Sequence, residues 1–354
     1  MKRLIIKNFG PILNAELELK QLNLIIGPQS SGKSCLLKTA CYCAWVEKRI
    51  EITQRADDFM EGDTFIRNLM TYHHAEGYAH DNTYISYETD YLLFKYSHET
   101  GFQWYWKEGR WQWRRAKISY IPAERMLVGV VPNWYRIDLG KTNLQEFLSD
   151  WEDARKSVTQ DKDILNIGVK YHFDNTLKTD QIIVNGGPTL NLSETSSGVQ
   201  SLVPLYLQID YIVSQQYKDK RPESIAERSE RDLLLKLIED EKLDIKVNNY
   251  IYTDHCDIFL EEPEVNLFPV AQCDLVSWLF DRVLVNQPHN LFVATHSPYI
   301  LTAFLERDYD LNLFLISEQD KGVVITTASA DDIQRIYDKG IDAFFNLSSL
   351  TQEV

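Results

Sequence analysis

A glycine-rich turn near the start of the chain constrains the fold more than any other feature. The run GPQSSGKS at 27–34 matches the pattern G-x-x-x-x-G-K-[S/T], after the apolar run LNLII and before a segment with a helical pattern over 33–48. Glycines let backbone N–H groups surround phosphate oxygens, and the start of a helix adds its positive dipole end. The turn therefore predicts a phosphate-binding loop, with Lys33 reaching the β- and γ-phosphates and Ser34 binding Mg²⁺.

Two carboxylates directly follow a second apolar strand. The segment DIFLE ends at Glu261, and Glu262 comes next. An enzyme with a phosphate loop needs an acid there to hold Mg²⁺, and a second acid to polarise the attacking water. We expect Glu261 to take the first role and Glu262 the second. The alternative is an acidic surface turn.

Two more turns place polar groups at the ends of apolar elements. Ser197 and Gly198 stand at the start of a long apolar helix predicted over 198–217, where a hydroxyl and N–H groups suit an anion. The alternative is a plain helix cap. His296 follows the apolar strand NLFVAT and could hydrogen-bond a phosphate oxygen, or could be an ordinary loop histidine.

Charge and composition exclude several classes of protein. The 354 residues include 52 acids and 37 strong bases, a net charge of −15, which argues against a basic surface for non-specific nucleic-acid binding. No apolar run reaches the roughly 18–20 residues of a membrane span, so we expect no membrane partner and a cytoplasmic protein. The five cysteines include no CxxC pair, which favours reduced, buried thiols over disulfides or a zinc site.

An aromatic stretch over 83–121 predicts an antiparallel β-meander, with a tight hairpin at Glu108-Gly109 and a strand at RWQWRR. Its tryptophans and arginines could stack nucleic-acid bases and pair with phosphates, or could simply pack across strands. The side chains in question are Trp104, Trp106, Trp111, Trp113, Arg110, Arg114 and Arg115.

The order of the four turns resembles that of the ABC-type ATPases, and most of all the branch that contains OLD-family nucleases, RecF-like proteins and SMC heads. The segments NFGPI and YIPAER (120–125) resemble the same branch. The resemblance implies one α/β domain over 1–354, a P-loop NTPase of ABC-ATPase type. Its mixed central sheet would be flanked by helices and carry an antiparallel β-meander lobe. Insertions would occupy 46–115 (the aromatic meander), 133–168 (helical) and 218–250 (charged and helical).

The same resemblance implies roles for individual residues. Ser197 and Gly198 would contact the γ-phosphate of ATP held by a second copy, so that a homodimer or larger homo-oligomer encloses ATP and Mg²⁺. Glu262 would be the catalytic base and His296 the γ-phosphate sensor. The stretch 123–125 would correspond to the Q-loop, although it has no glutamine.

Two further features belong to the resemblance. Asn266 would lie in the loop that communicates across the dimer, and Glu261 stands where most ABC proteins have aspartate. The predicted nucleotide contacts are Gly27, Pro28, Gln29, Ser30, Ser31, Gly32, Lys33, Ser34, Cys35, Ser197 and Gly198; the predicted catalytic residues are Lys33, Glu262 and His296; and the predicted metal ligands are Ser34 and Glu261.

The segment after His296 bears on the biological role. OLD nucleases carry a nuclease domain after the ATPase, but only 58 residues follow His296 here, and the Asp308-Tyr309-Asp310 triplet precedes an apolar run instead of ending a strand. We therefore expect a loop at this triplet and an ATPase that switches a separately encoded effector, a nuclease or toxin, in bacterial anti-phage defence. The alternatives are a RecF-like ATPase that binds duplex DNA, and an ATP-gated scaffold that holds a toxin with little hydrolysis.

Overall fold

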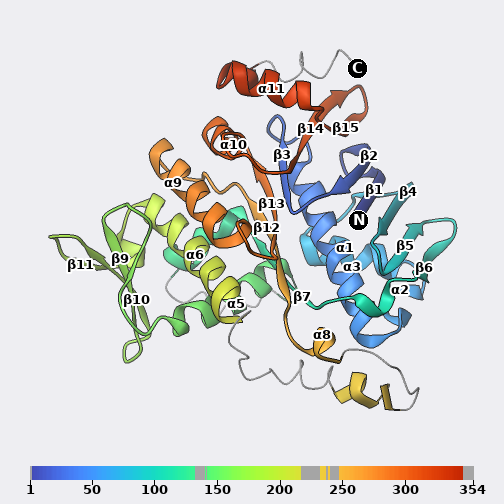
Figure 1. Cartoon of the computed structure of the whole chain (residues 1–354), viewed down its shortest axis with the longest axis horizontal. Helices are drawn as coiled ribbons and strands as arrows, with labels where there is room; N and C mark the ends of the chain where they lie inside the picture. Colours follow the sequence, from blue (N-terminus) through green and yellow to red (C-terminus); the bar gives the residue numbers. More distant parts are fainter. Residues whose placement is uncertain are drawn as a thin grey trace.

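An eleven-stranded mixed sheet forms the centre of the protein (Figure 1). The computed structural model describes residues 2–131, 140, 142–216, 232–236, 238–239 and 247–345. From one edge to the other, the strands are β6 (Gly101–Trp106), β5 (Leu92–Ser97), β4 (Ala79–Glu88), β1 (Lys2–Phe9), β2 (Ile12–Leu19), β15 (Gly322–Thr327), β14 (Leu311–Gln319), β3 (Leu22–Ile26), β13 (Asn290–Thr295), β12 (His255–Glu261) and β7 (Ala116–Ile121).

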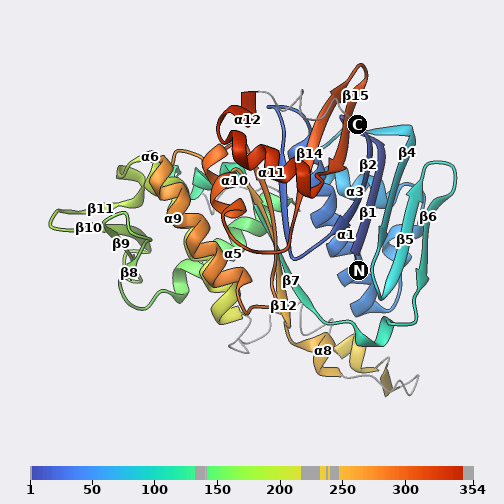
Figure 2. The same cartoon turned by 45° about the horizontal axis from the view of Figure 1, so that its top comes forward.

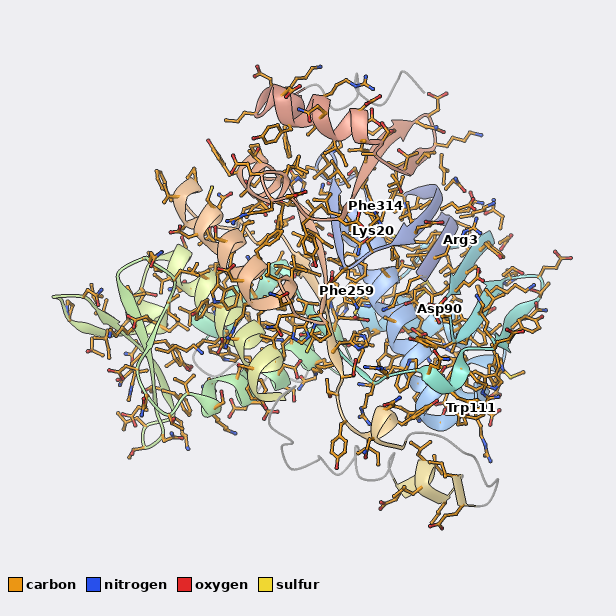
Figure 3. The ribbon with its side chains drawn as sticks, viewed as in Figure 1. Arg3, Lys20, Asp90, Trp111, Phe259 and Phe314 are labelled. Carbon is orange, nitrogen blue, oxygen red and sulfur yellow. The ribbon has the colours of Figure 1, made fainter. Side chains whose placement is uncertain are left out.

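Five neighbouring strands of this sheet, β14, β3, β13, β12 and β7, run parallel to one another. Helix α1 (Lys33–Thr53) packs on one face of this parallel part, and the side chains of the strands alternate between two cores. Leu24 belongs to one core and Ile25 to the other. Phe259 and Phe292 stack on the α1 side with ring centroids 4.5 Å apart, and Figure 3 shows Phe259 and Phe314 beside the central strands. Both faces are covered, which explains the continuously apolar strand sequences.

The other end of the sheet is an antiparallel lobe made of β1, β2, β4, β5 and β6, which lie side by side in Figure 2. Helices α2 (Asp57–Met60) and α3 (Thr64–His73) belong to the same lobe. The predicted aromatic meander is therefore confirmed over β4 to β6.

The predicted hairpin at Glu108-Gly109 and the strand at RWQWRR are wrong. This stretch holds a 3₁₀ turn, η1 (Arg110–Gln112), and the next strand, β7, pairs with β12 at the far edge of the sheet. The guanidinium of Arg110 lies 3.9 Å from the ring centres of both Trp106 and Trp111. Trp111 thus packs on Arg110, and Trp113 packs on Tyr250, instead of across a strand pair. A period of two cannot separate these outcomes.

A second, four-stranded antiparallel sheet stands on the opposite side of the central strands (Figure 1). It consists of β8 (Lys162–Asp163), β9 (Val169–Asp174), β10 (Thr179–Val184) and β11 (Thr189–Asn191). The strands predicted near 169–173 and 181–184 are confirmed. Helices α5 (Asn143–Ser157) and α6 (Ser197–Tyr211) pack against each other beside this sheet.

Shorter elements complete the described part of the chain. They are η2 (Ala123–Met126), α4 (Leu127–Val130), η4 (Leu192–Glu194), η5 (Ile212–Gln216), α8 (Val247–Ile251), α9 (Pro269–Leu279), η6 (Phe280–Leu284), α10 (Pro298–Leu305), α11 (Ala330–Lys339) and α12 (Asp342–Phe345). Of the predicted 133–168 insertion, residues 133–139 and 141 lie outside the described residues, as does most of the charged insertion at 218–250.

Two expectations from composition can be compared with the structure. Within the described ranges, no helix is long and apolar enough to cross a membrane. All five cysteines are free thiols, and four are buried. The expectation of buried thiols is wrong for Cys273, which is exposed on α9.

Candidate functional site

The predicted site elements meet at one edge of the parallel strands. The phosphate loop follows β3, the acidic pair ends β12, His296 follows β13, and the PAER stretch follows β7. Because neighbouring parallel strands end at the same edge, these four turns lie together, and ligands of open α/β sheets bind at this edge.

The phosphate loop requires its two glycines. Gly32, the residue before α1, has a left-handed backbone with φ +93°, and a Cβ there would lie 2.8 Å from the Cγ of Pro11. A Cβ on Gly27 would lie 2.9 Å from the Cβ of Ile316. The buried hydroxyl of Ser31 has no hydrogen-bond partner, which fits a loop that receives a polar ligand.

Lys33 points back into this loop. Its Nζ donates to the backbone oxygens of Gly27, at 2.9 Å, and Pro28, at 2.6 Å. Burial lowers the pKa of Lys33 to about 8, while the carboxylates of Glu262 and Glu264 act in the opposite direction. A buried ammonium held by carbonyl oxygens alone gains a stronger partner when a phosphate enters the loop.

Glu262 faces His296 across the cavity. The Glu262 Oε1 lies 3.4 Å from the His296 Nε2, and this contact lowers the pKa of Glu262 against the opposing effect of its partial burial. The carboxyl is therefore ionised at neutral pH and can accept a hydrogen bond from a water molecule. Glu262 has φ +41°, and its N–H donates to the oxygen of Ala294 at 2.8 Å, which fixes the turn.

Glu264 is a site residue for which the sequence predicts no role. Its Oε1 accepts a hydrogen bond from the backbone N–H of His296 at 2.6 Å, and its Oε2 accepts one from the Thr295 hydroxyl at 2.9 Å. One carboxylate thus ties the turn after β12 to the turn after β13. In the sequence, the only indication that Glu264 belongs to the site is its position in the Glu-Glu-Pro-Glu run.

A cavity of about 360 Å³ joins these turns. Its lining combines most of the phosphate loop with the acid and the histidine from the neighbouring strands. The lining residues are Pro11, Gln29, Ser30, Ser31, Gly32, Lys33, Ser34, Cys35, Tyr78, Glu262 and His296. The structure therefore brings Glu262 and His296 to the phosphate loop, as expected from the order of the motifs.

The oxygen donors at this site fit a magnesium ion held together with a nucleotide. Ser34 lines the cavity, whereas the buried carboxylate of Glu261, at the end of β12 and directly before Glu262, is not among the lining residues. Mg²⁺ prefers one or two protein oxygens plus phosphates and water over an all-protein cage. No group of three or more His, Cys, Asp or Glu side chains that could hold a metal occurs among the described residues.

Ser197 and Gly198 lie apart from this cavity. Ser197 is the exposed first residue of α6, and none of the described residues that line the cavity comes from this helix. Ser196, not Ser197, precedes the helix as its cap. Gly198 packs on the loop after β12, because a Cβ there would lie 2.8 Å from the backbone oxygen of Asn266. The chain's own Ser197 is therefore displayed outward.

Arg125 of the PAER stretch is fully buried between the cavity and α6. The hydrogen bonds that it donates to described residues all end on main-chain oxygens, including those of Glu261, Glu262 and Ser201. Burial lowers the pKa of Arg125 to about 10, whereas the neighbouring glutamates raise it, so the guanidinium stays charged at neutral pH.

The tryptophans and arginines of the aromatic stretch are largely occupied by internal contacts. Trp113 and Arg115 are buried, and Arg114 pairs with Asp254 at 3.0 Å. The guanidinium of Arg110 contacts the indole rings of Trp106 and Trp111, and Figure 3 shows Trp111 at the end of this lobe. These contacts fit the packing alternative, and no observation favours nucleic-acid binding at this stretch.

The Asp308-Tyr309-Asp310 triplet forms the predicted loop before β14. Asp310 pairs with Lys20 at 2.5 Å. Because β14 runs parallel to β3 and the triplet precedes it, the triplet lies at the edge of the sheet opposite the phosphate loop. The triplet is thus not part of the cavity.

Together, the fold and the cavity define an α/β protein with a P-loop at the carboxyl edge of a mixed sheet, flanked by helices and extended by an antiparallel lobe. The predicted α/β architecture, a mixed central sheet flanked by helices and extended by an antiparallel lobe, is confirmed. No family model matches the sequence, and no curated protein matches it.

Among solved structures, the chain is similar to the SMC head domain from Thermotoga maritima, with 13% identity, a TM-score of 0.44, and coverage of 93% of this chain and 98% of that one. It is similar to an SMC head bound to the C-terminal winged-helix domain of ScpA, with 10% identity, a TM-score of 0.46, and coverage of 94% and 99%. A third similar structure is an SMC head with an extended coiled coil, bound to the C-terminal domain of ScpA derived from Pyrococcus furiosus, with 9% identity, a TM-score of 0.45, and coverage of 96% and 99%. Similarity this remote assigns no activity to the chain.

Proposed function

We propose that this chain is an ABC-type ATPase and that two copies close around ATP. The observation that carries the proposal is the single cavity in which the phosphate loop, Glu262 and His296 meet. A glycine-built cradle with a buried lysine suits nucleotide phosphates, and an ionised carboxylate beside it suits the attacking water. A protein that only binds the nucleotide needs no ionised carboxylate beside the phosphates.

Each residue has a distinct task in this proposal. Lys33 leaves the loop carbonyls and pairs with the β- and γ-phosphates, while the loop N–H groups bind phosphate oxygens. Ser34 and Glu261 hold Mg²⁺, which offsets phosphate charge when bound. Glu262 orients a water molecule and accepts its proton, and His296, positioned by Glu264, donates a hydrogen bond to the γ-phosphate.

The second copy completes the site. Ser197 is exposed on α6 and does not line the cavity of its own chain, so a contact between Ser197 and a nucleotide would have to reach one held by another copy. Two copies related by a twofold axis would give each nucleotide one phosphate loop and one Ser197-Gly198 turn. Closure upon ATP binding, and opening after hydrolysis, would make the pair a switch.

We further propose that this switch controls a separately encoded effector in bacterial anti-phage defence. The support is the resemblance of the four motifs to the OLD-like branch. The net charge of −15 suits a basic protein partner. Co-purification from the native host, with and without ATP, tests this part: a nuclease or toxin bound to the chain supports it, and a chain that binds duplex DNA by itself contradicts it.

ATP hydrolysis by the purified protein tests the enzymatic part of the proposal. We expect Mg²⁺-dependent turnover that Lys33→Ala abolishes, because the ammonium is the chain's buried positive charge in the phosphate loop. Lys321→Ala, on the exposed turn between β14 and β15, is the matched control and should hydrolyse ATP normally. Normal turnover by a folded Lys33→Ala protein would refute the assignment of the cavity.

A further inference from the structure

Arg125 joins two parts of the molecule that the proposed function uses separately. Its Nη1 donates to the backbone oxygen of Glu261 at 2.9 Å, and its Nη2 donates to that of Glu262 at 2.8 Å. Its Nε donates to the backbone oxygen of Ser201 at 3.2 Å. One planar, fully buried side chain therefore holds both the acidic strand end and the second turn of α6.

The strand end needs this support because its backbone is strained. Glu262 is a non-glycine residue with φ +41°, an unfavourable conformation that persists only where surrounding contacts impose it. The N–H of Glu262 donates to Ala294 and its carbonyl accepts from Arg125. If the Glu262 carboxylate moves together with its backbone, the hydrogen bond from Arg125 to the Glu262 backbone oxygen therefore changes.

Helix α6 is equally tied to this region. Gln200 is buried, and its Nε2 donates to the backbone oxygens of Ser193, at 3.1 Å, and Thr195, at 2.9 Å, which precede the Ser197-Gly198 turn. A Cβ on Gly129 would lie 3.2 Å from the Cβ of Gln200, so the segment after Arg125 packs closely on the helix. A displacement at Ser201 thus moves the turn together with the helix.

We propose that Arg125 is a positioning residue that couples the Glu262 turn of the chain's own cavity to α6, so that the nucleotide state of one site sets the position of the Ser197-Gly198 turn offered to the second copy. The coupling rests on the proposed function, since it requires ATP in the cavity. A guanidinium is suited to this task because its fixed fork reaches several carbonyls at once, whereas a lysine ammonium has one donor centre.

Hydrogen exchange on a chain that cannot pair tests the coupling within one molecule. The parent is Ser197→Arg, which places a bulky charge on the exposed start of α6 and is expected to remain monomeric with ATP. Exchange is followed in two regions, residues 27–40 and residues 199–209, with Mg²⁺ plus ATP, Mg²⁺ plus ADP, or no nucleotide. We expect ATP to slow exchange in both regions, by roughly fivefold or more in α6, the lower end of typical coupling between sites.

The decisive comparison adds Arg125→Lys to this parent. We expect the protection of residues 27–40 to remain and the ATP response of residues 199–209 to disappear. Arg155→Lys is the matched control, because Arg155 is also a buried arginine but pairs with Asp180 on the second sheet; it should leave both responses intact. Should Arg125→Lys fail to fold, Arg125→Gln makes the same comparison, since its amide can still donate to one carbonyl of the strand end.

The outcomes separate the coupling from the proposed function. ATP responses in both regions of the Arg125→Lys protein overturn the coupling and leave ATP binding intact. Protection of residues 27–40 without any response in α6 of the parent also overturns it. Absence of protection at residues 27–40 in the parent means that the cavity does not bind ATP, in which case the proposed function fails and the coupling fails with it.

Discussion

Replacing Glu262 by glutamine removes the ionised carboxylate from the cavity and keeps the size of the side chain. The structure separates the expected effects on chemistry and on stability. A positioned general base contributes about 10²–10⁴-fold to a rate, so hydrolysis should fall by a factor in this range, roughly 3–5 kcal/mol of barrier. The Glu262 side chain is 37% exposed, and its partner His296 lies 3.4 Å away; a partly exposed polar contact of this kind contributes at most about 1 kcal/mol to the free energy of unfolding.

Steady-state ATP hydrolysis and urea unfolding, measured on the same preparation, test this reasoning. We expect Glu262→Gln to lose at least about a hundredfold in kcat, to unfold within about 1 kcal/mol of the parent, and to accumulate as an ATP-bound dimer in sedimentation velocity. Glu318→Gln, the same change at an exposed position on β14, should match the parent in all three measurements. Hydrolysis by folded Glu262→Gln within about threefold of the parent would refute the role of Glu262, because a general base is worth far more.

Two further predictions follow from the geometry. The pKa of Lys33 is about 8 before ATP binds, and bound phosphates raise this pKa. ATP binding at pH 8 should therefore take up roughly half a proton, and the affinity for ATP should fall as the pH rises above 8. Calorimetry in buffers of different ionisation enthalpy measures the proton uptake, and zero uptake would contradict this prediction. Gly198→Ala should lower the free energy of unfolding by about 1–3 kcal/mol, since its Cβ would lie 2.8 Å from the Asn266 oxygen; an unchanged urea midpoint would contradict this packing.

The meeting of the phosphate loop, Glu262 and His296 in one cavity was predictable because each of these motifs follows a strand. Once Gly27, Glu262 and His296 follow strands that run parallel, geometry places them at one edge of the sheet. The strand and helix types were also predictable, since buried parallel strands and apolar helices have distinctive patterns.

The contacts between the turns were not predictable. Arg125 binds main-chain oxygens of residues that are 76 to 137 positions away, and carbonyls have no side-chain signature. Glu264 could be read only as one more acid in an acidic run, although it fixes His296. The strand predicted at RWQWRR is wrong for a related reason. Alternating aromatic residues indicate which side chains are packed, but they do not distinguish a strand from a turn that packs on Arg110.

The central claim, a site completed by a second copy, is tested most directly by mixing two inactive variants. Lys33→Ala disables the phosphate loop, and Ser197→Arg disables the turn on the exposed start of α6 without the internal clash expected at Gly198. Each variant alone should be inactive. An equal mixture should recover ATP hydrolysis to at most about one half of the wild-type rate, because the mixed pair holds one complete site of two and its single arginine faces the loop that lacks Lys33. A mixture no more active than its folded components, or full activity of Ser197→Arg alone, would contradict the shared site.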